Sequence, residues 1–216
     1  MSAIRLVALG DACVTVQFSQ TIDEAVNEQC IAAAEVLERR SIRGVLDVVP
    51  TYNAVTVYFD PLRIDRPSLD AELHGVGEAA SRRTASTPRT IDIPVTYGGA
   101  SGPDLQSVAE FAGVSAAEVV RLHTSTTYRV YMLGFLPGFA YMGSVDARIA
   151  MPRLETPRIR VTAGSIGIAG AQTGIYPCDT PGGWRIIGRT LEKMFEPARE
   201  EPFLLKAGDR VRFVAQ

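Results

Sequence analysis

Apolar positions near the N-terminus follow first a two-residue period and then a helical one. Val14, Val16 and Phe18 alternate with polar residues, which predicts a strand with one buried face. Apolar residues then recur at helical spacing from residue 22 to about residue 40. Residues 21–24, Thr-Ile-Asp-Glu, predict a capping box at the start of this helix, in which the glutamate reaches back to the first backbone amide.

The pattern up to residue 95 completes a small α+β domain. Its further predicted elements are strands over residues 45–49 and 55–59, a helix over 67–82 and a strand over 91–95. Counted from residue 13, the order is β-α-β-β-α-β, the ferredoxin-like order of an antiparallel sheet covered by two helices. The last strand begins the next domain instead if the polar segment 81–88 is a linker. We expect domains over residues 1–88 and 89–216.

Beyond residue 100 the pattern changes from two short helices to many short strands. The helices are predicted near residues 103–112 and 115–125, the second with a capping box that begins at Ser115. Short apolar runs separated by Gly and Pro follow over residues 128–133, 165–169, 174–176, 184–187 and 210–214. Strands this short, with so many turn residues between them, predict a barrel or a sandwich.

Composition and charge narrow the class of protein. With 22 basic and 24 acidic residues the formal net charge is -2, so there is no basic excess for binding nucleic acid. The 3 cysteines are scattered without a CxxC or Cys/His cluster, so we expect neither a disulfide framework nor a metal site. No apolar run is long enough to span a bilayer and the N-terminus does not resemble a signal peptide, so a cytoplasmic protein is expected.

A glycine- and proline-rich segment over residues 134–143 carries three aromatic side chains. Phe135, Phe139 and Tyr141 lie on what must be a loop, because Gly and Pro disfavour a helix or a central strand there. These rings either plug the end of the barrel or line a ligand groove or a subunit interface.

A second such segment, residues 164–177, adds polar candidates. Gln172, Thr173 and Tyr176 are suited to bind an amide-like substrate, although the glycines around them also fit a tight barrel hairpin. Neither a Walker loop nor a GxGxxG motif before a helix occurs, so no nucleotide-binding motif is recognised in this chain.

A third segment, residues 179–190, contains the only tryptophan and a candidate cation. Trp184 is by default a core residue, and Arg189 is either a solvated barrel residue or a clamp for a carboxylate. His123, one of 2 histidines, lies on the apolar face of a predicted helix. It is either a core or helix-capping residue or the proton carrier nearest to these loops, because imidazole titrates near pH 7.

Taken together, these segments resemble the family of 5-oxoprolinase B subunits, also called allophanate hydrolase subunit 1 or KipI-type kinase inhibitors. The resemblance is carried by the runs GFLPGFAY (134–141), PR (152–153), TPR (156–158), AGSIGIAG (163–170), QTGIYP (172–177) and PGGWRIIGRT (181–190). The chain departs from the family pattern at Thr162, where a proline is usual, and at the acidic Glu155.

The resemblance implies a cyclophilin-like β-barrel after the small N-terminal domain. It also implies a hetero-oligomer with a related barrel protein, called the C subunit, and with a third protein, the A subunit. The implied activity is ATP-dependent opening of 5-oxoproline to glutamate, with ATP used by the assembled complex. There are two alternatives. The first is a subunit of an enzyme that hydrolyses allophanate, which is a ureido compound. The second is an inhibitor that binds a sensor histidine kinase.

A cyclic amide with a carboxylate requires an apolar wall, groups that read the amide, a cation and a proton carrier. The predicted apolar wall consists of Phe135, Phe139 and Tyr141, and Trp184 is a further predicted substrate-binding residue. Gln172 and Tyr176 are predicted to hydrogen-bond the amide. Arg189 is predicted to bind the carboxylate, and His123 to carry the proton.

Overall fold

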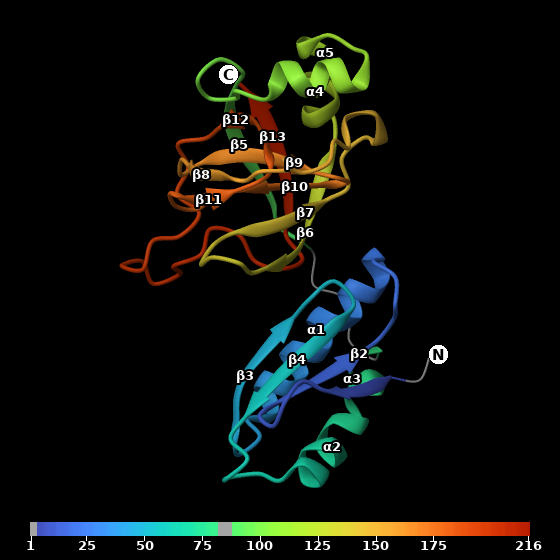
Figure 1. Ribbon diagram of the computed structural model, residues 1–216. Coiled ribbons are helices and arrows are strands. Elements are labelled where there is room, and N and C mark those ends of the chain that lie inside the picture. The colour runs from blue at the N-terminus through green and yellow to red at the C-terminus, as the bar shows by residue number, and fades with distance from the viewer. Residues whose placement is uncertain (1–3, 82–87) are drawn as a thin grey trace. The chain divides into compact units, whose positions relative to one another are not determined.

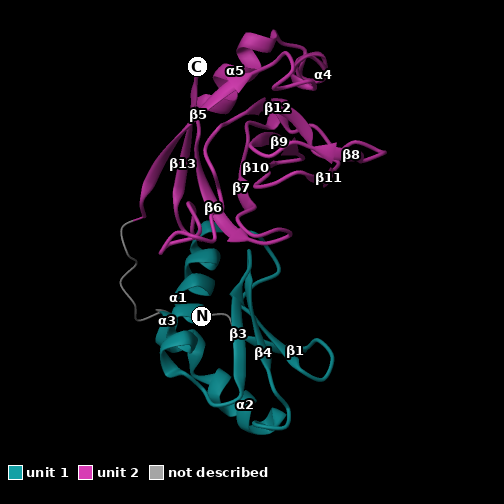
Figure 2. Ribbon diagram, turned by 90° about the vertical axis from the view of Figure 1, so that its left-hand side faces the viewer, with its two compact units in different colours: residues 1–87 teal, residues 88–216 magenta. Residues whose placement is uncertain are grey.

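The computed structural model describes residues 4–81 and 88–216, which belong to two compact units (Figure 2). The first unit comprises residues 1–87 and the second residues 88–216. Among the described residues, no helix combines the length and the apolar character needed to cross a membrane.

The first unit is an antiparallel sheet of four strands in the order β1-β2-β4-β3, with helices on one face (Figure 2). Its elements are β1 (Arg5–Ala8), β2 (Cys13–Gln17), α1 (Glu24–Arg40), β3 (Val45–Pro50), β4 (Ala54–Phe59), α2 (Arg66–His74) and α3 (Val76–Ser81). The core joins the alternating residues of β2 and β4 to the apolar faces of the three helices.

The predicted β-α-β-β-α-β order is not found, because the strand predicted over residues 91–95 belongs to the barrel of the second unit. The strand that pairs with the free edge of β2 is β1, which precedes it, with Leu6 opposite Val16. The alternative that residues 91–95 begin the next domain is confirmed. Most of the proposed linker, 82–87, lies outside the described residues.

Helix starts follow the capping chemistry with one correction. The N-cap of α1 is Asp23, whose carboxylate accepts from the amides of Ala25 and Val26 at 2.9 and 3.2 Å, so the capping box predicted at residue 21 is wrong. Ser115 caps the second helix of the barrel unit as predicted. The helix predicted over residues 67–82 is two helices that meet at Gly75.

Seven strands of the second unit close into a barrel in the order β10-β7-β6-β13-β5-β12-β9, which confirms the predicted barrel (Figure 1). They are β5 (Thr90–Tyr97), β6 (Thr127–Leu133), β7 (Ala140–Gly143), β9 (Ser165–Ala169), β10 (Gln172–Ile175), β12 (Arg185–Arg189) and β13 (Arg210–Ala215). The unit also contains α4 (Leu105–Ala112), α5 (Ala116–Thr124), the short helix η1 (Ala147–Ile149), and a separate ribbon of β8 (Arg158–Val161) and β11 (Thr180–Gly182).

Successive residues of each strand point to opposite sides of the barrel wall. On β9, Ile166 and Ile168 join the main core, whereas Ala169 joins a second apolar cluster. On β13, Val211 and Phe213 are buried while Arg212 is exposed, as the alternation predicts.

A buried carboxylate connects three elements of this unit. Asp104, just before α4, accepts from the backbone amide of Ile186 at 2.6 Å and from the guanidinium of Arg158 at 2.6 Å. Its own amide donates to the carbonyl of Ile186 at 2.8 Å. Asp104 is buried, so its negative charge depends on these donors.

We expect Asp104→Ala to lower the free energy of unfolding of the barrel unit by about 3 kcal/mol, because it leaves Arg158 and the Ile186 amide without their acceptor. Urea unfolding followed by the fluorescence of Trp184, the only tryptophan, reports on this unit. Asp92→Ala is the matched control, because its ion pair with Arg212 is exposed and should matter little. Equal losses in the two variants would contradict the expectation.

Candidate functional site

Five of the predicted site residues form one cluster of rings. Phe139 is at its centre, in edge-to-face contact with its neighbours at 4.9–5.5 Å between ring centroids: Phe135, Tyr141, Tyr176 and Trp184. Such contacts stabilise a cluster beyond the burial of its area. The three segments named from sequence therefore meet on the second unit.

The cluster lies on the outer side of the barrel wall and not in its end. A Cβ atom at Gly167 of β9 would lie 2.9 Å from Cβ of Trp184, and one at Gly174 of β10 would lie 3.0 Å from Cζ3 of the same ring. Only glycine permits this close approach. The glycines that also fitted a barrel hairpin therefore have a second role, because they make room for Trp184.

The rings divide into a buried and an exposed set. Phe139, Tyr176 and Trp184 are at most 5% exposed, whereas Phe135 is 61% exposed and Tyr141 is half-buried. The inner rings therefore act as packing residues, as expected by default for Trp184. The outer rings, Phe135 and Tyr141, remain accessible to a ligand or a partner.

The two amide-reading candidates differ in their burial. Tyr176 is 1% exposed, and its hydroxyl is held by the backbone of Trp184, which does not fit the predicted role of reading a substrate amide. Gln172 is half-buried at the start of β10, opposite Gly143 of β7 and Ala169 of β9. By alternation it shares the outer face with Gly174.

The cation found beside the ring cluster is Arg153, whereas the sequence predicted Arg189. The Nε atom of Arg189 donates to the carbonyl of Ala163 at 2.9 Å. Arg153 has its guanidinium 5.8 Å from the centroid of Trp184, within the range of a cation–π contact. Arg153 was not predicted as a site residue, because it is an exposed loop residue outside any periodic hydrophobic pattern. The one sequence feature that pointed to it was the run Pro152-Arg153, which is part of the family resemblance.

His123 lies in the barrel interior, separated from the rings by the wall. Its ring is fully buried and stacks on Phe213 at 4.6 Å between centroids. The hydroxyl of Thr173 donates to the carbonyl of Gly167, so its oxygen accepts from Nε2 of His123 at 3.0 Å. Nδ1 then accepts from the hydroxyl of Tyr97 at 2.7 Å, and the imidazole is neutral.

Comparisons with known proteins agree with these segments. Residues 4–205 match the family described as carboxyltransferase domain, subdomain C and D. The B subunit of 5-oxoprolinase from Bacillus subtilis (strain 168) is 40% identical over 216 residues, covering 95% of this chain and 90% of that protein. That of Escherichia coli O157:H7 is 40% identical over 217 residues, covering 100% of this chain and 98% of that protein. The chain belongs to the family of 5-oxoprolinase B subunits.

A solved structure shows the same fold within a longer chain. The crystal structure of TTHA0988 matches with a TM-score of 0.83 and 40% sequence identity, covering 94% of this chain. The present chain spans 40% of that chain. In TTHA0988 this fold is therefore one part of a longer chain.

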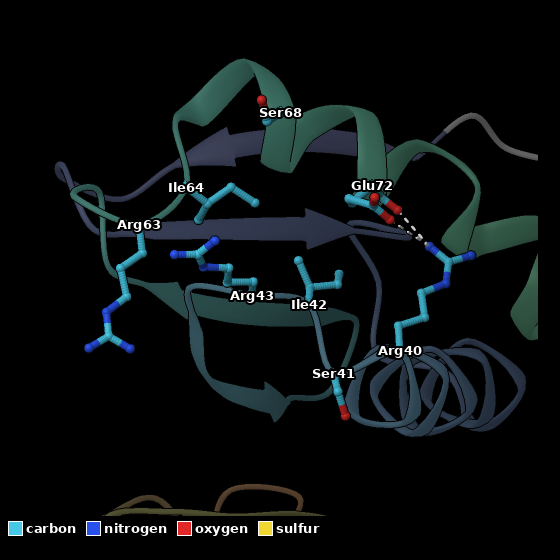
Figure 3. Close-up of a pocket in the computed structure, with 8 residues that line it drawn as sticks. All are labelled: Arg40, Ser41, Ile42, Arg43, Arg63, Ile64, Ser68 and Glu72. Carbon is cyan, nitrogen blue, oxygen red and sulfur yellow. Dashed lines mark hydrogen bonds and ion pairs between the residues drawn. The ribbon is translucent and has the colours of Figure 1, made fainter.

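A depression of about 620 Å³ lies in the first unit, residues 1–87 (Figure 3). Three of its lining residues are arginines, Arg40, Arg43 and Arg63. Arg40 donates to the carbonyl of Glu72 at 2.7 Å, and Arg63 pairs with Asp60 at 3.2 Å. Within the described parts of the chain, no group of His, Cys, Asp and Glu residues could hold a metal ion.

The electrostatics of His123 do not fit the predicted role of a neutral-pH proton carrier. Burial lowers the pKa of His123 from 6.5 to about 3. Between these values the unfolded chain binds a proton that the folded chain does not. Stability from this group is therefore complete above pH 6.5 and is lost as the pH falls toward 3.

We expect His123→Ala to lower the free energy of unfolding of the barrel unit by about 3 kcal/mol at pH 7, because it creates a cavity, leaves the Tyr97 hydroxyl without its acceptor and removes the donor to the Thr173 oxygen. This difference from the wild type should shrink at pH 5, where the wild type has lost about 2 kcal/mol through His123. Urea unfolding at both pH values measures it.

His74→Ala provides the control, because His74 is exposed and lies in the other unit. It should leave the barrel transition unchanged at both pH values. A His123→Ala variant with wild-type stability but lost activity in the assembled enzyme would restore the proton-carrier hypothesis.

Proposed function

We propose that this chain is the B subunit of an ATP-dependent 5-oxoprolinase complex that opens 5-oxoproline to glutamate. The observation that carries the proposal is 40% identity, over 95% or more of the chain, to two proteins named as B subunits of 5-oxoprolinase. The alternatives, allophanate hydrolysis and inhibition of a sensor kinase, are less favoured because those relatives carry the 5-oxoprolinase name.

We assign the accessible side of the aromatic cluster to the substrate or to the partner that completes its site. Phe135 and Tyr141 offer an apolar surface against which a five-membered lactam ring can lie, and Gln172 offers an amide on the same side of the wall. His123 does not contribute to this site in the proposal, because it lies on the other side of the wall.

ATP binding is assigned to the partner subunits. A phosphate cradle needs backbone amides exposed at a helix start. In the described barrel unit, the residues before its two longer helices are instead Asp104, which binds β12, and Ser115, which accepts from the amide of Glu118. No nucleotide-binding motif is recognised in the sequence either, so the proposal places ATP on the partner subunits.

The partners in this proposal are a related barrel protein, the C subunit, and the A subunit, in the cytoplasm. In TTHA0988 the match covers only 40% of the chain, so this fold is accompanied there by further protein, which is in keeping with a fold that works together with other domains or subunits. Exposed apolar side chains of the barrel unit are available for association, with Phe135 61%, Ile159 92% and Leu191 90% exposed.

Co-expression with the candidate partners tests the assembly. We expect a stable hetero-oligomer that buries well over about 1,000 Å², because smaller contacts seldom persist in dilute solution. Size-exclusion chromatography at micromolar concentration measures it. Separate peaks for the individual proteins would contradict the proposal, and a mixture with an unrelated barrel protein is the control.

Glutamate release from 5-oxoproline tests the activity. We expect release only when ATP and all components of the complex are present, and no ATP hydrolysis above background by the isolated chain, because the chain has no Walker motif. Allophanate in the same assay separates the alternative substrate. Turnover of ATP by the purified chain alone would contradict the assignment.

A further inference from the structure

The backbone around Arg153 is fixed on both sides, although its side chain is exposed. The Nε atom of Arg185 donates to the carbonyl of Pro152 at 3.1 Å. The amide of Leu154 donates to the carbonyl of Gly183 at 2.7 Å. These bonds attach the segment between η1 and β8 to the residues that flank Trp184. A ligand at Arg153 therefore meets a backbone already in position, which reduces the entropy lost on binding.

Three other arginines of the barrel unit already hold a protein acceptor. Arg158 binds the carboxylate of Asp104, Arg160 binds that of Asp179, and Arg189 binds the carbonyl of Ala163. The contact found for Arg153 among the described residues is the face of Trp184. Its guanidinium can bind an incoming anion without breaking an ion pair.

A phenol and an aromatic face lie beside this cation. Burial raises the pKa of Tyr141, and the nearby charge of Arg153 opposes that rise. Tyr141 therefore keeps its proton at neutral pH, and its ring contacts both Phe139 and Trp184. A planar guanidinium binds a carboxylate through two parallel hydrogen bonds, and the methylene groups of a small lactam ring can pack on an aromatic surface.

We infer that Arg153 binds the carboxylate of a small lactam acid at the accessible edge of the aromatic cluster, beside Tyr141. The inference rests on the proposed function, which supplies 5-oxoproline as the ligand. It gives Arg153 the role that the sequence pattern predicted for Arg189.

The fluorescence of Trp184 reads out binding directly, because the chain has 1 tryptophan. The full-length chain is titrated with 5-oxoproline and with 2-pyrrolidinone, which has the same lactam ring but no carboxylate. The variants are Arg153→Ala, Arg153→Lys and Arg189→Ala. Arg148→Ala is the control, an exposed arginine whose partner is Asp146.

We expect a saturable change in Trp184 fluorescence with 5-oxoproline. The affinity should fall at least about tenfold in Arg153→Ala. It should fall less in Arg153→Lys, which keeps the positive charge but cannot form the two parallel hydrogen bonds of a guanidinium. Binding of 2-pyrrolidinone should be weak and equal in the wild type and Arg153→Ala. Arg148→Ala and Arg189→Ala should bind 5-oxoproline like the wild type. Unchanged melting temperatures exclude unfolding as the cause.

The inference is overturned if the wild type gives no saturable response, if Arg153→Ala binds as tightly as the wild type, or if Arg189→Ala is the variant that loses binding. The glutamate-release assay of the complex is independent of these outcomes. If the complex releases glutamate normally and Arg153→Ala binds 5-oxoproline as the wild type does, the inference about Arg153 is wrong and the proposed function stands. Saturable binding to the wild-type chain that depends on Arg153, without glutamate release by the complex, contradicts the proposed function and leaves the inference standing.

Discussion

Trp184 packs directly on the backbone of the barrel wall, and the outer face of the second unit depends on this contact. It requires positions 167 and 174 to lack side chains, because Cβ atoms there would lie 2.9 and 3.0 Å from carbons of Trp184. With this ring in place, Phe139 and Tyr176 meet edge to face and are excluded from water. Two glycines thus convert one outward face of a barrel into an apolar platform.

The same wall separates two chemically different environments. Thr173 points inward to His123, and the next residue, Gly174, lies against Phe139 and Trp184 on the outer side. The inner side holds an uncharged chain of hydrogen bonds among buried groups, which favours a single arrangement of the core. The outer side carries the accessible rings and Arg153. Neighbouring positions in one short strand therefore serve stability and binding separately.

Six of the seven barrel strands overlap runs predicted from sequence, whereas β7 lies where a loop was predicted, so that prediction is wrong for Tyr141. The function of each wall face could not be predicted. Alternation reveals β13, where Arg212 faces water between Val211 and Phe213. On β9 all five residues are buried, because the aromatic cluster covers the outer side, so no alternation marks which side is which. This explains why Phe139, Tyr176 and Trp184 could be grouped from their segments, whereas the position of His123 behind the wall could not. A short edge strand such as β1 gave too weak a period to be predicted.

Solvent exposure lowers the affinity of Arg153 for a carboxylate in the isolated chain, so saturation there requires a higher ligand concentration than in a covered site. An exposed guanidinium binds a carboxylate weakly, because water and salt screen the attraction. Phe135, 61% exposed in the same ring cluster, is a surface that a partner protein can cover. Covering the cluster excludes water, lowers the local dielectric and strengthens the bond to the carboxylate. Affinity for the ligand and affinity for the partner are then coupled, and thermodynamic linkage requires each to raise the other by the same factor.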